Sequence, residues 1–184
     1  MTNVFIIHGT GGHPEENWFP WLKKELETLG CKVIIPQFPT PENQTPETWF
    51  AVFDKYKEHF TSDTILIAHS LGGAFALRIL ERSKITIKAA FFVGTPVGVR
   101  PIKNWDGDLP FIGKPFDWNK IKSHTHRSIV FHSNNDPYVS LGNGELLAEK
   151  LDVQLTFIKN AGHFNRTSGY EKFEELLKKV KIEL

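Results

Sequence analysis

Three residues whose side chains could carry out nucleophilic chemistry each follow a different predicted strand: Ser70, Asp136 and His163. A serine hydroxyl is a poor nucleophile near neutral pH and needs a histidine to take its proton. That histidine in turn needs a carboxylate to orient its ring. The three residue types together predict acyl transfer through a covalent intermediate on Ser70.

The residues around Ser70 fit a sharp strand-to-helix turn. The sequence AHSLG, residues 68–72, is the G-x-S-x-G nucleophile elbow with alanine in place of its first glycine. Small residues are needed because the backbone turns so tightly that larger side chains two positions away would collide. The alternative is that Ser70 merely caps the following helix, as serine often does. The strand–turn–helix context and the pair Gly72-Gly73 favour the nucleophile.

A glycine-rich sequence, HGTGG at residues 8–12, follows the first predicted strand. A dinucleotide-binding loop is excluded because the third glycine of G-x-G-x-x-G would fall on Pro14. The alternative is an oxyanion loop, in which the backbone amide of Thr10 acts together with that of Leu71. His8 is expected to fix this loop through its ring nitrogens.

Of the eight histidines, His132 and His163 lie directly after predicted strands. His163 is favoured as the base because its loop, NAGHFN, can reach over the sheet. His132 is expected to point into the sheet edge. His69 is expected to face away from the nucleophile and to have a packing or loop-fixing role.

Asp136 is favoured as the acid because Pro137 holds it in an extended conformation. The order serine, aspartate, histidine along the chain is that of α/β-hydrolases. A helix-initiating turn is the alternative interpretation of Asp136. Asp106, Asp108 and Asp117 are weaker candidates because they lie in an irregular segment.

The elements that must position these residues alternate between strands and helices. Apolar runs without polar alternation predict strands buried on both faces at 3–8, 32–36, 64–68, 88–93, 127–132 and 153–158. Helical spacing appears at 18–30, 45–60, 73–80, 144–151 and 168–180. This alternation predicts one α/β domain over residues 1–184, a three-layer α/β/α sandwich around a mostly parallel six-stranded sheet.

An insert at 94–125 interrupts this alternation with four prolines and four glycines. It also carries aromatic side chains, and Trp105, Phe116 and Trp118 are candidates for lining an apolar substrate pocket. Each of them could equally be a core residue beneath a long loop.

Composition narrows the function classes. The 22 Lys and Arg against 21 Asp and Glu give a net charge of +1, which offers no basic surplus for nucleic acid. A single cysteine excludes an internal disulfide. No signal peptide or membrane-spanning run is recognisable, so a cytoplasmic location with no membrane partner is expected. No metal or organic cofactor is expected, since no ligand cluster is present and acyl transfer requires none.

The motifs IIHGTGG, AHSLGG, DWNKI, SNNDPYVS and AGHFN resemble those of the YdeN-like serine hydrolases, small α/β-hydrolases related to retinoblastoma-binding protein nine. The resemblance covers nearly the whole chain. It implies strand order 2-1-3-4-5-6 and no large cap domain. It also implies the roles already named: Ser70 as nucleophile, Asp136 as acid, His163 as base, and Thr10 and Leu71 as oxyanion donors.

The resulting hypothesis is a serine hydrolase that cleaves small esters or short peptides. Two alternatives remain open. The same triad could transfer its acyl group to another acceptor, or the fold could serve as a protein-interaction module with vestigial catalysis. The sequence names no protein partner.

Overall fold

The computed structural model describes all 184 residues, and its six strands form one sheet. They are β1 (Asn3–Ile7), β2 (Lys32–Ile34), β3 (Thr64–His69), β4 (Ala89–Val93), β5 (Ser128–His132) and β6 (Leu155–Phe157). Their order is β2-β1-β3-β4-β5-β6, and all five pairings are parallel. The predicted α/β class and strand order are therefore confirmed, with no large cap domain.

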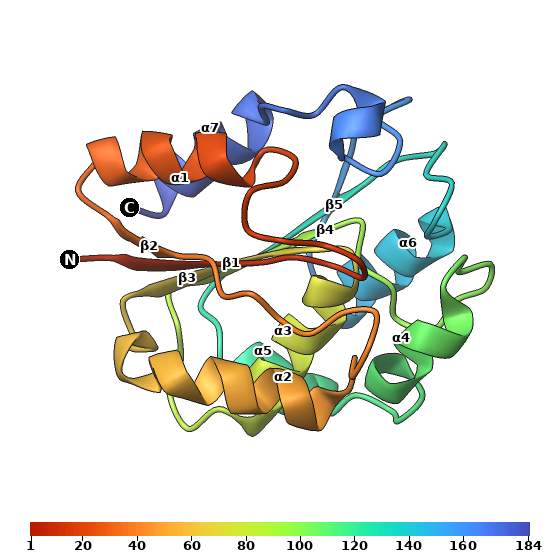
Figure 1. Cartoon of the computed structure of the whole chain (residues 1–184), viewed down its shortest axis with the longest axis horizontal. Coiled ribbons are helices and arrows are strands. Elements are labelled where there is room, and N and C mark those ends of the chain that lie inside the picture. Colours follow the sequence, from red (N-terminus) through yellow and green to blue (C-terminus); the bar gives the residue numbers. More distant parts are fainter.

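Helices cover both faces of this sheet (Figure 1). They are α1 (Phe19–Thr28), α2 (Pro46–Phe53), α3 (Leu71–Arg82), α4 (Trp105–Ile112), α5 (Trp118–Ser123), α6 (Leu141–Lys150) and α7 (Glu174–Ile182). Helices α1 and α7 lie on one face, and α2, α3 and α5 lie on the other. Two 3-10 helices, Asp54–His59 and Arg166–Ser168, complete the elements.

The inner strands are largely apolar because each face of the sheet has its own core. In β1, Val4 and Ile6 pack beneath α1 and α7, whereas Phe5 and Ile7 pack against the α2–α3 layer. All four side chains are fully buried. Strands buried on both faces show continuous apolar runs instead of alternation, which is the pattern seen in the sequence.

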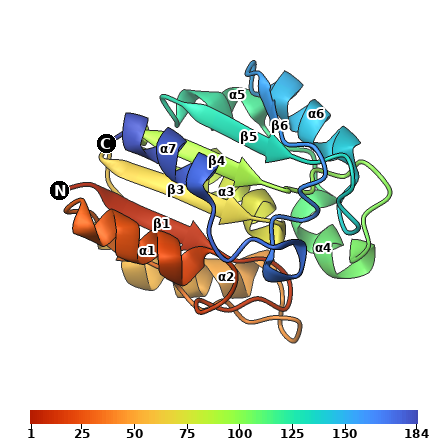
Figure 2. The same cartoon turned by 90° about the horizontal axis from the view of Figure 1, so that it is seen from above.

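The parallel arrangement brings the carboxyl ends of all strands to one edge of the sheet. In Figure 2 the strand arrows point toward the end where α4 lies, and the marked chain termini lie at the opposite end. Ligand sites in open parallel sheets form beyond these carboxyl ends. No helix in the structure has the length and hydropathy needed to cross a membrane.

The segment 94–125 is more ordered than the sequence suggested. It contains two short helices, α4 and α5, instead of a continuous irregular insert. Pro110 lies inside α4. Because proline lacks an N–H and its ring disfavours helix interiors, the sequence did not predict a helix here.

Arg78, a buried cation on α3, holds this segment against α3. Its Nε donates to the carbonyl of Phe111 at 3.0 Å, and its other nitrogens donate to the carbonyls of Lys114 and Pro115. It also pairs with Glu81 at 2.9 Å and stacks on Phe116, with its Cζ atom 3.9 Å from the ring centroid. One guanidinium therefore satisfies three carbonyls, one in the last turn of α4 and two in the link between α4 and α5.

We expect Arg78→Met to lower the free energy of unfolding by about 3 kcal/mol, because it leaves a carboxylate and three carbonyls without their donor. Urea denaturation would measure the loss, and hydrogen exchange would locate faster opening in residues 105–123. Arg82→Met is the matched control, since Arg82 is exposed on the same helix. Equal losses from the two variants would contradict this account of Arg78.

Candidate active site

Ser70 occupies the corner between β3 and α3 in a strained backbone conformation. Its φ is 55° and its ψ is −130°, a region that residues with a Cβ atom rarely adopt. Its side chain makes no capping hydrogen bond to α3. The structure therefore does not support the helix-cap interpretation, and such strain is concentrated at functional sites.

The small residues around Ser70 are needed for close backbone approach. A Cβ atom on Gly72 would lie 2.5 Å from the carbonyl oxygens of Ile7 and His8. A Cβ atom on Gly9 would lie 2.7 Å from the Cβ of Ser70. The elbow and the loop after β1 are thus in contact through their glycines, as the sequence motif requires.

Asp136 lies in the loop after β5, and its side chain is fully buried. Its Oδ1 accepts hydrogen bonds from the amides of Tyr138 at 2.8 Å and Val139 at 3.0 Å. Its Oδ2 lies 2.6 Å from Nδ1 of His163. The turn that follows Pro137 therefore uses one carboxylate oxygen to fix the side chain and leaves the other for the imidazole.

These contacts keep Asp136 ionised. Burial alone would raise the pKa of its carboxyl, but the hydrogen bond and charge of His163 and the two amides outweigh burial and lower it. A carboxylate only accepts hydrogen bonds, so Nδ1 of His163 carries a hydrogen. In the neutral form of the ring, the other nitrogen, Nε2, then has no hydrogen and can accept a proton.

The loop that carries His163 is fixed from three directions. The ring of His69 donates from Nε2 to the carbonyl of His163 at 2.7 Å, and Ser168 accepts from the amide of His163 at 3.3 Å. Trp18 donates from its indole to the carbonyl of Phe164 at 2.9 Å. Burial, together with the charge of His163, lowers the pKa of His69 to about 3, so its ring remains neutral. The loop-fixing role expected for His69 is confirmed.

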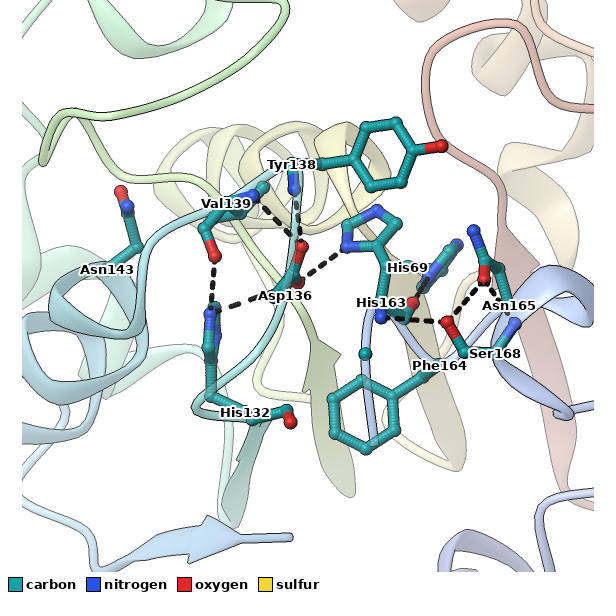
Figure 3. A network of polar contacts seen from close by, with 12 residues as sticks. His69, His132, Asp136, Tyr138, Val139, Asn143, His163, Phe164, Asn165 and Ser168 are labelled. Atoms are coloured by element: carbon teal, nitrogen blue, oxygen red, sulfur yellow. Dashed lines mark hydrogen bonds and ion pairs between the residues drawn. The ribbon is translucent and has the colours of Figure 1, made fainter. Parts of the chain in front are cut away.

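Figure 3 shows Asp136 between the rings of two histidines, His132 and His163. Nε2 of His132 donates to the carbonyl of Val139 at 3.0 Å and is 4.0 Å from Oδ2 of Asp136. Burial lowers the pKa of His132 and keeps its ring neutral. His132 therefore supports the turn behind Asp136, whereas His163 lies on the cavity side.

The loops after β5 and β6 are hydrogen-bonded to each other, residue by residue. Ser133 Oγ accepts from the amide of Ala161 at 2.9 Å, and Asn135 Oδ1 accepts from the amide of Gly162 at 2.8 Å. Asn134 makes two further bonds to Asn160, at 2.8 and 3.0 Å. These contacts join the aspartate loop and the histidine loop into one unit.

The two candidate oxyanion donors come from two segments, the loop after β1 and the start of α3. Thr10 follows Gly9 in the loop after β1, and its amide makes no backbone hydrogen bond there. Leu71 is the first residue of α3; its side chain is buried in the core, and it is not among the residues that line the cavity. His8 holds the loop as expected, since Nδ1 contacts the Gly9 carbonyl and Nε2 accepts from the Phe38 amide at 3.0 Å.

Ser70 and His163 open into the same cavity of about 260 Å³ at the carboxyl edge of the sheet. The cavity walls are polar and come from the loops after β1, β4, β5 and β6 and from the corner between β3 and α3. The lining residues are Gly9, Thr10, Glu16, Asn17, His69, Ser70, Asn104, Tyr138, His163, Asn165, Arg166 and Thr167. The ring of Tyr138 lies 4.9 Å from that of His163 and forms the one apolar surface.

Comparison with known proteins decides the family. The model of the serine hydrolase family matches residues 4–181. This chain belongs to the serine hydrolase family. It is 30% identical to the YdeN protein of Bacillus subtilis (strain 168) over 175 residues, which cover 91% of this chain and 88% of YdeN. It is 28% identical to the serine hydrolase RBBP9 of Rattus norvegicus over 183 residues, which cover 98% of this chain and 94% of RBBP9.

Solved structures agree with this assignment. The crystal structure of the ydeN gene product from B. subtilis matches this serine hydrolase with a TM-score of 0.92 and 26% identity, covering 100% of this chain and 98% of that chain. Est1E from Butyrivibrio proteoclasticus matches with a TM-score of 0.69 and 18% identity, covering 98% and 90%, and shares the fold. The resemblance to YdeN-like serine hydrolases is confirmed.

One prediction about the pocket needs correction. Trp105, Phe116 and Trp118 do not line the cavity of this serine hydrolase. Phe116 is buried under the guanidinium of Arg78, and the ring of Trp118 packs on it with 5.1 Å between centroids. The ring of Trp105 is covered by Arg100 at 4.0 Å. These rings pack against the core and against cations, which is the alternative that the sequence left open.

Sequence reasoning missed most of the polar lining. Glu16, Asn17, Asn104, Asn165 and Arg166 come from loops that follow β1, β4 and β6. The available signal was their position after the carboxyl ends of strands, where ligand sites form. Polar residues in surface loops are common, so their type gave no further indication.

A buried acid, Asp108, lies beside the loop after β1. It is 3% exposed, and its Oδ1 accepts from the hydroxyl of Thr10 at 3.0 Å. Burial raises the pKa of this carboxyl from 3.8 to about 6, although the Thr10 hydrogen bond and the charge of His163 act in the opposite direction.

The raised pKa of Asp108 predicts how stability depends on pH. The folded protein holds this proton more tightly than the unfolded chain, so the stabilisation is fully present below about pH 4 and is lost as the pH rises through about 6. Asp108→Asn should therefore raise the free energy of unfolding at pH 7.5 by on the order of 2 kcal/mol, and have little effect at pH 4. Denaturation of both proteins at the two pH values would measure this, and a pH-independent difference would contradict it.

Proposed function

We propose that this protein hydrolyses small esters through a Ser70–His163–Asp136 triad. The observation that carries the proposal is the hydrogen bond of 2.6 Å between His163 and Asp136, formed at a cavity that His163 shares with the strained Ser70. The arrangement of a nucleophile, a base and a residue that orients the base is typical of serine hydrolases.

In the acylation step, Oγ of Ser70 attacks the ester carbonyl carbon while Nε2 of His163 takes its proton. The tetrahedral intermediate collapses, and His163 returns the proton to the leaving alcohol. Water then attacks the acyl-enzyme with the same proton transfers, releasing the acid and restoring Ser70. Asp136 stabilises the imidazolium that forms in each step.

The negative oxygen of each tetrahedral intermediate needs hydrogen-bond donors. We assign this role to the backbone amides of Thr10 and Leu71. Thr10 lines the same cavity as Ser70, and Leu71 follows Ser70 in the sequence. The position of Leu71 at the start of α3 supports the assignment, because the first amides of a helix have no intrahelical acceptor. Each such donor accounts for roughly a 10²- to 10³-fold increase in rate.

The size and polarity of the cavity favour a small polar substrate. A volume of about 260 Å³ holds a short acyl group, and the amides and charged groups of its walls would be left without partners by a long alkyl chain. We therefore propose hydrolysis of short-chain esters with hydrogen-bonding substituents, with short peptides as a second group of substrates cleaved by the same triad.

A fluorophosphonate probe tests the nucleophile directly, because an activated serine oxygen displaces fluoride from its phosphorus. We expect one adduct, mapped by mass spectrometry to Ser70 and absent from Ser70→Ala. Ser140→Ala is a matched control, because Ser140 also precedes a helix but lies outside the cavity. An unlabelled wild-type protein, or labelling that survives Ser70→Ala, would overturn the proposal.

Aryl esters of increasing acyl length then test the substrate class. We expect kcat/KM to be highest for two- to four-carbon acyl groups and to fall for chains of eight carbons or more. A preference for the long chains would contradict the proposed polar pocket while leaving the triad in place.

A further inference from the structure

Asp108 is a carboxyl group in an unusual setting. It is 3% exposed and makes no ion pair, and the Thr10 hydroxyl is its one side-chain hydrogen bond. A buried carboxyl without a cation destabilises a fold, and such groups are concentrated at functional sites. The triad does not use Asp108, which comes from α4, in a different part of the chain.

The hydrogen-bond partner of Asp108 is Thr10, the one residue with a side chain in a run of glycines. In the loop Gly9-Thr10-Gly11-Gly12, only Thr10 has a Cβ atom, and Gly11 has a positive φ of 69°. Glycine adopts many backbone conformations, so the glycines alone do not fix the direction of the Thr10 amide. The carbonyl of that peptide, on Gly9, is held locally by the His8 ring and the Gly12 amide. The Thr10 side chain is the one side chain of this run through which a distant segment can orient the peptide further.

A second chain of hydrogen bonds connects the same two segments. The amide of Gly11 donates to Thr40 Oγ1 at 2.6 Å, and that hydroxyl donates to Gln44 Oε1 at 2.5 Å. Gln44 then donates from Nε2 to the carbonyl of Gly107 at 2.9 Å. Residues 10 and 11 are thus attached to residues 108 and 107, one through a direct bond and the other through two polar side chains.

We propose that Asp108 is a positioning residue that orients the Thr10 amide in the oxyanion hole. This inference rests on the proposed function, in which that amide stabilises the tetrahedral intermediate. Because the single hydroxyl hydrogen of Thr10 is directed to Asp108, Thr10 acts on the oxyanion through its amide and not through its hydroxyl. Helix α4 is thereby part of the catalytic apparatus.

Matched variants separate positioning from charge and from folding. Asp108→Asn keeps an acceptor oxygen and removes the charge, whereas Asp108→Ala removes both. Thr10→Ser keeps the hydroxyl, and Thr10→Val removes it at nearly constant shape. Asp106→Ala removes an exposed carboxyl from the same helix and serves as the control.

We expect Asp108→Ala and Thr10→Val each to lower kcat for a short-chain aryl ester about 10- to 100-fold, with KM changed less than about threefold, because a misplaced donor affects mainly the transition state. Asp108→Asn and Thr10→Ser should stay within about threefold of wild type. The double variant Asp108→Ala/Thr10→Val should lose no more than either single variant, since both remove the same hydrogen bond.

Three outcomes would overturn the role of Asp108. They are an unchanged kcat in Asp108→Ala, losses that multiply in the double variant, or an equal loss in Asp108→Asn. Thermal melting of every variant shows whether a lost kcat reflects unfolding. The kcat of any destabilised variant is measured at a temperature below its unfolding transition. Failure of the proposed function gives a different result, in which Ser70→Ala turns the ester over as fast as the wild type does.

Discussion

Asp136→Asn should leave the fold intact and lower kcat about 10⁴-fold. The side chain differs from aspartate by one NH2 group in place of an oxygen, so packing in the fully buried site is preserved. The loss arises from the direction in which the new amide must point.

The amides of Tyr138 and Val139 both donate to one oxygen of Asp136. In the Asp136→Asn variant this position again requires an acceptor, so the side-chain amide oxygen takes it and the NH2 group faces Nδ1 of His163. Nδ1 must then accept a hydrogen bond, which moves the ring hydrogen to Nε2. A protonated Nε2 cannot take the proton of Ser70, so the variant holds the wrong tautomer.

Steady-state kinetics on a short-chain aryl ester and the rate of fluorophosphonate labelling would both measure this effect. Asp63→Asn is the matched control, since Asp63 is exposed and makes no ion pair. A kcat within tenfold of wild type for Asp136→Asn would show that Asp136 does not set the tautomer of His163.

Gly72→Ala should lower the free energy of unfolding by about 3 kcal/mol or more. The added Cβ would lie 2.5 Å from two carbonyl oxygens of the chain at the end of β1 and 2.9 Å from Cγ2 of Ile7. β1 is an interior strand, paired with β2 and β3, so its backbone cannot move aside cheaply. Either α3 shifts away from the sheet or the elbow changes its conformation, and both displace Ser70.

Urea denaturation measures the loss of stability, and the rate of Ser70 labelling measures the displacement. Gly107→Ala is the same change in α4, where the new Cβ would meet only Gln44 Nε2, at 3.4 Å. Alanine favours a helix over glycine by about 1 kcal/mol, so this control should be neutral or stabilising. A Gly72→Ala protein as stable as wild type would contradict the close approach of α3 and β1.

The sheet was predictable because its inner strands β1, β3 and β4 are buried on both faces and therefore largely apolar. The candidate triad residues were predictable because Ser70, Asp136 and His163 each follow a strand. Parallel strands bring such positions to one edge of the sheet whatever their separation in the chain. That rule needs no knowledge of side-chain packing.

What the sequence did not reveal depends on contacts between distant loops. Asp108 was passed over as a weak candidate for the acid, because its burial and its bond to Thr10 arise only when α4 meets the loop after β1. The aromatic rings of 94–125 were candidates either for the pocket or for the core. The buried guanidinium of Arg78 covers Phe116, and the exposed guanidinium of Arg100 covers Trp105. The spacing of these residues in the sequence does not show that either cation contacts an aromatic ring.

The bonds between the loops after β5 and β6 determine how this site can move. Because Ser133, Asn134 and Asn135 bond to residues 160–162, the proposed acid and the proposed base are carried on one hydrogen-bonded unit. The elbow with Ser70 is a second unit. His69 joins this elbow to the loop that carries His163, through its bond to the His163 carbonyl. We therefore expect motion at this site to change the separation of Ser70 and the His163 imidazole more than the separation of that imidazole and Asp136.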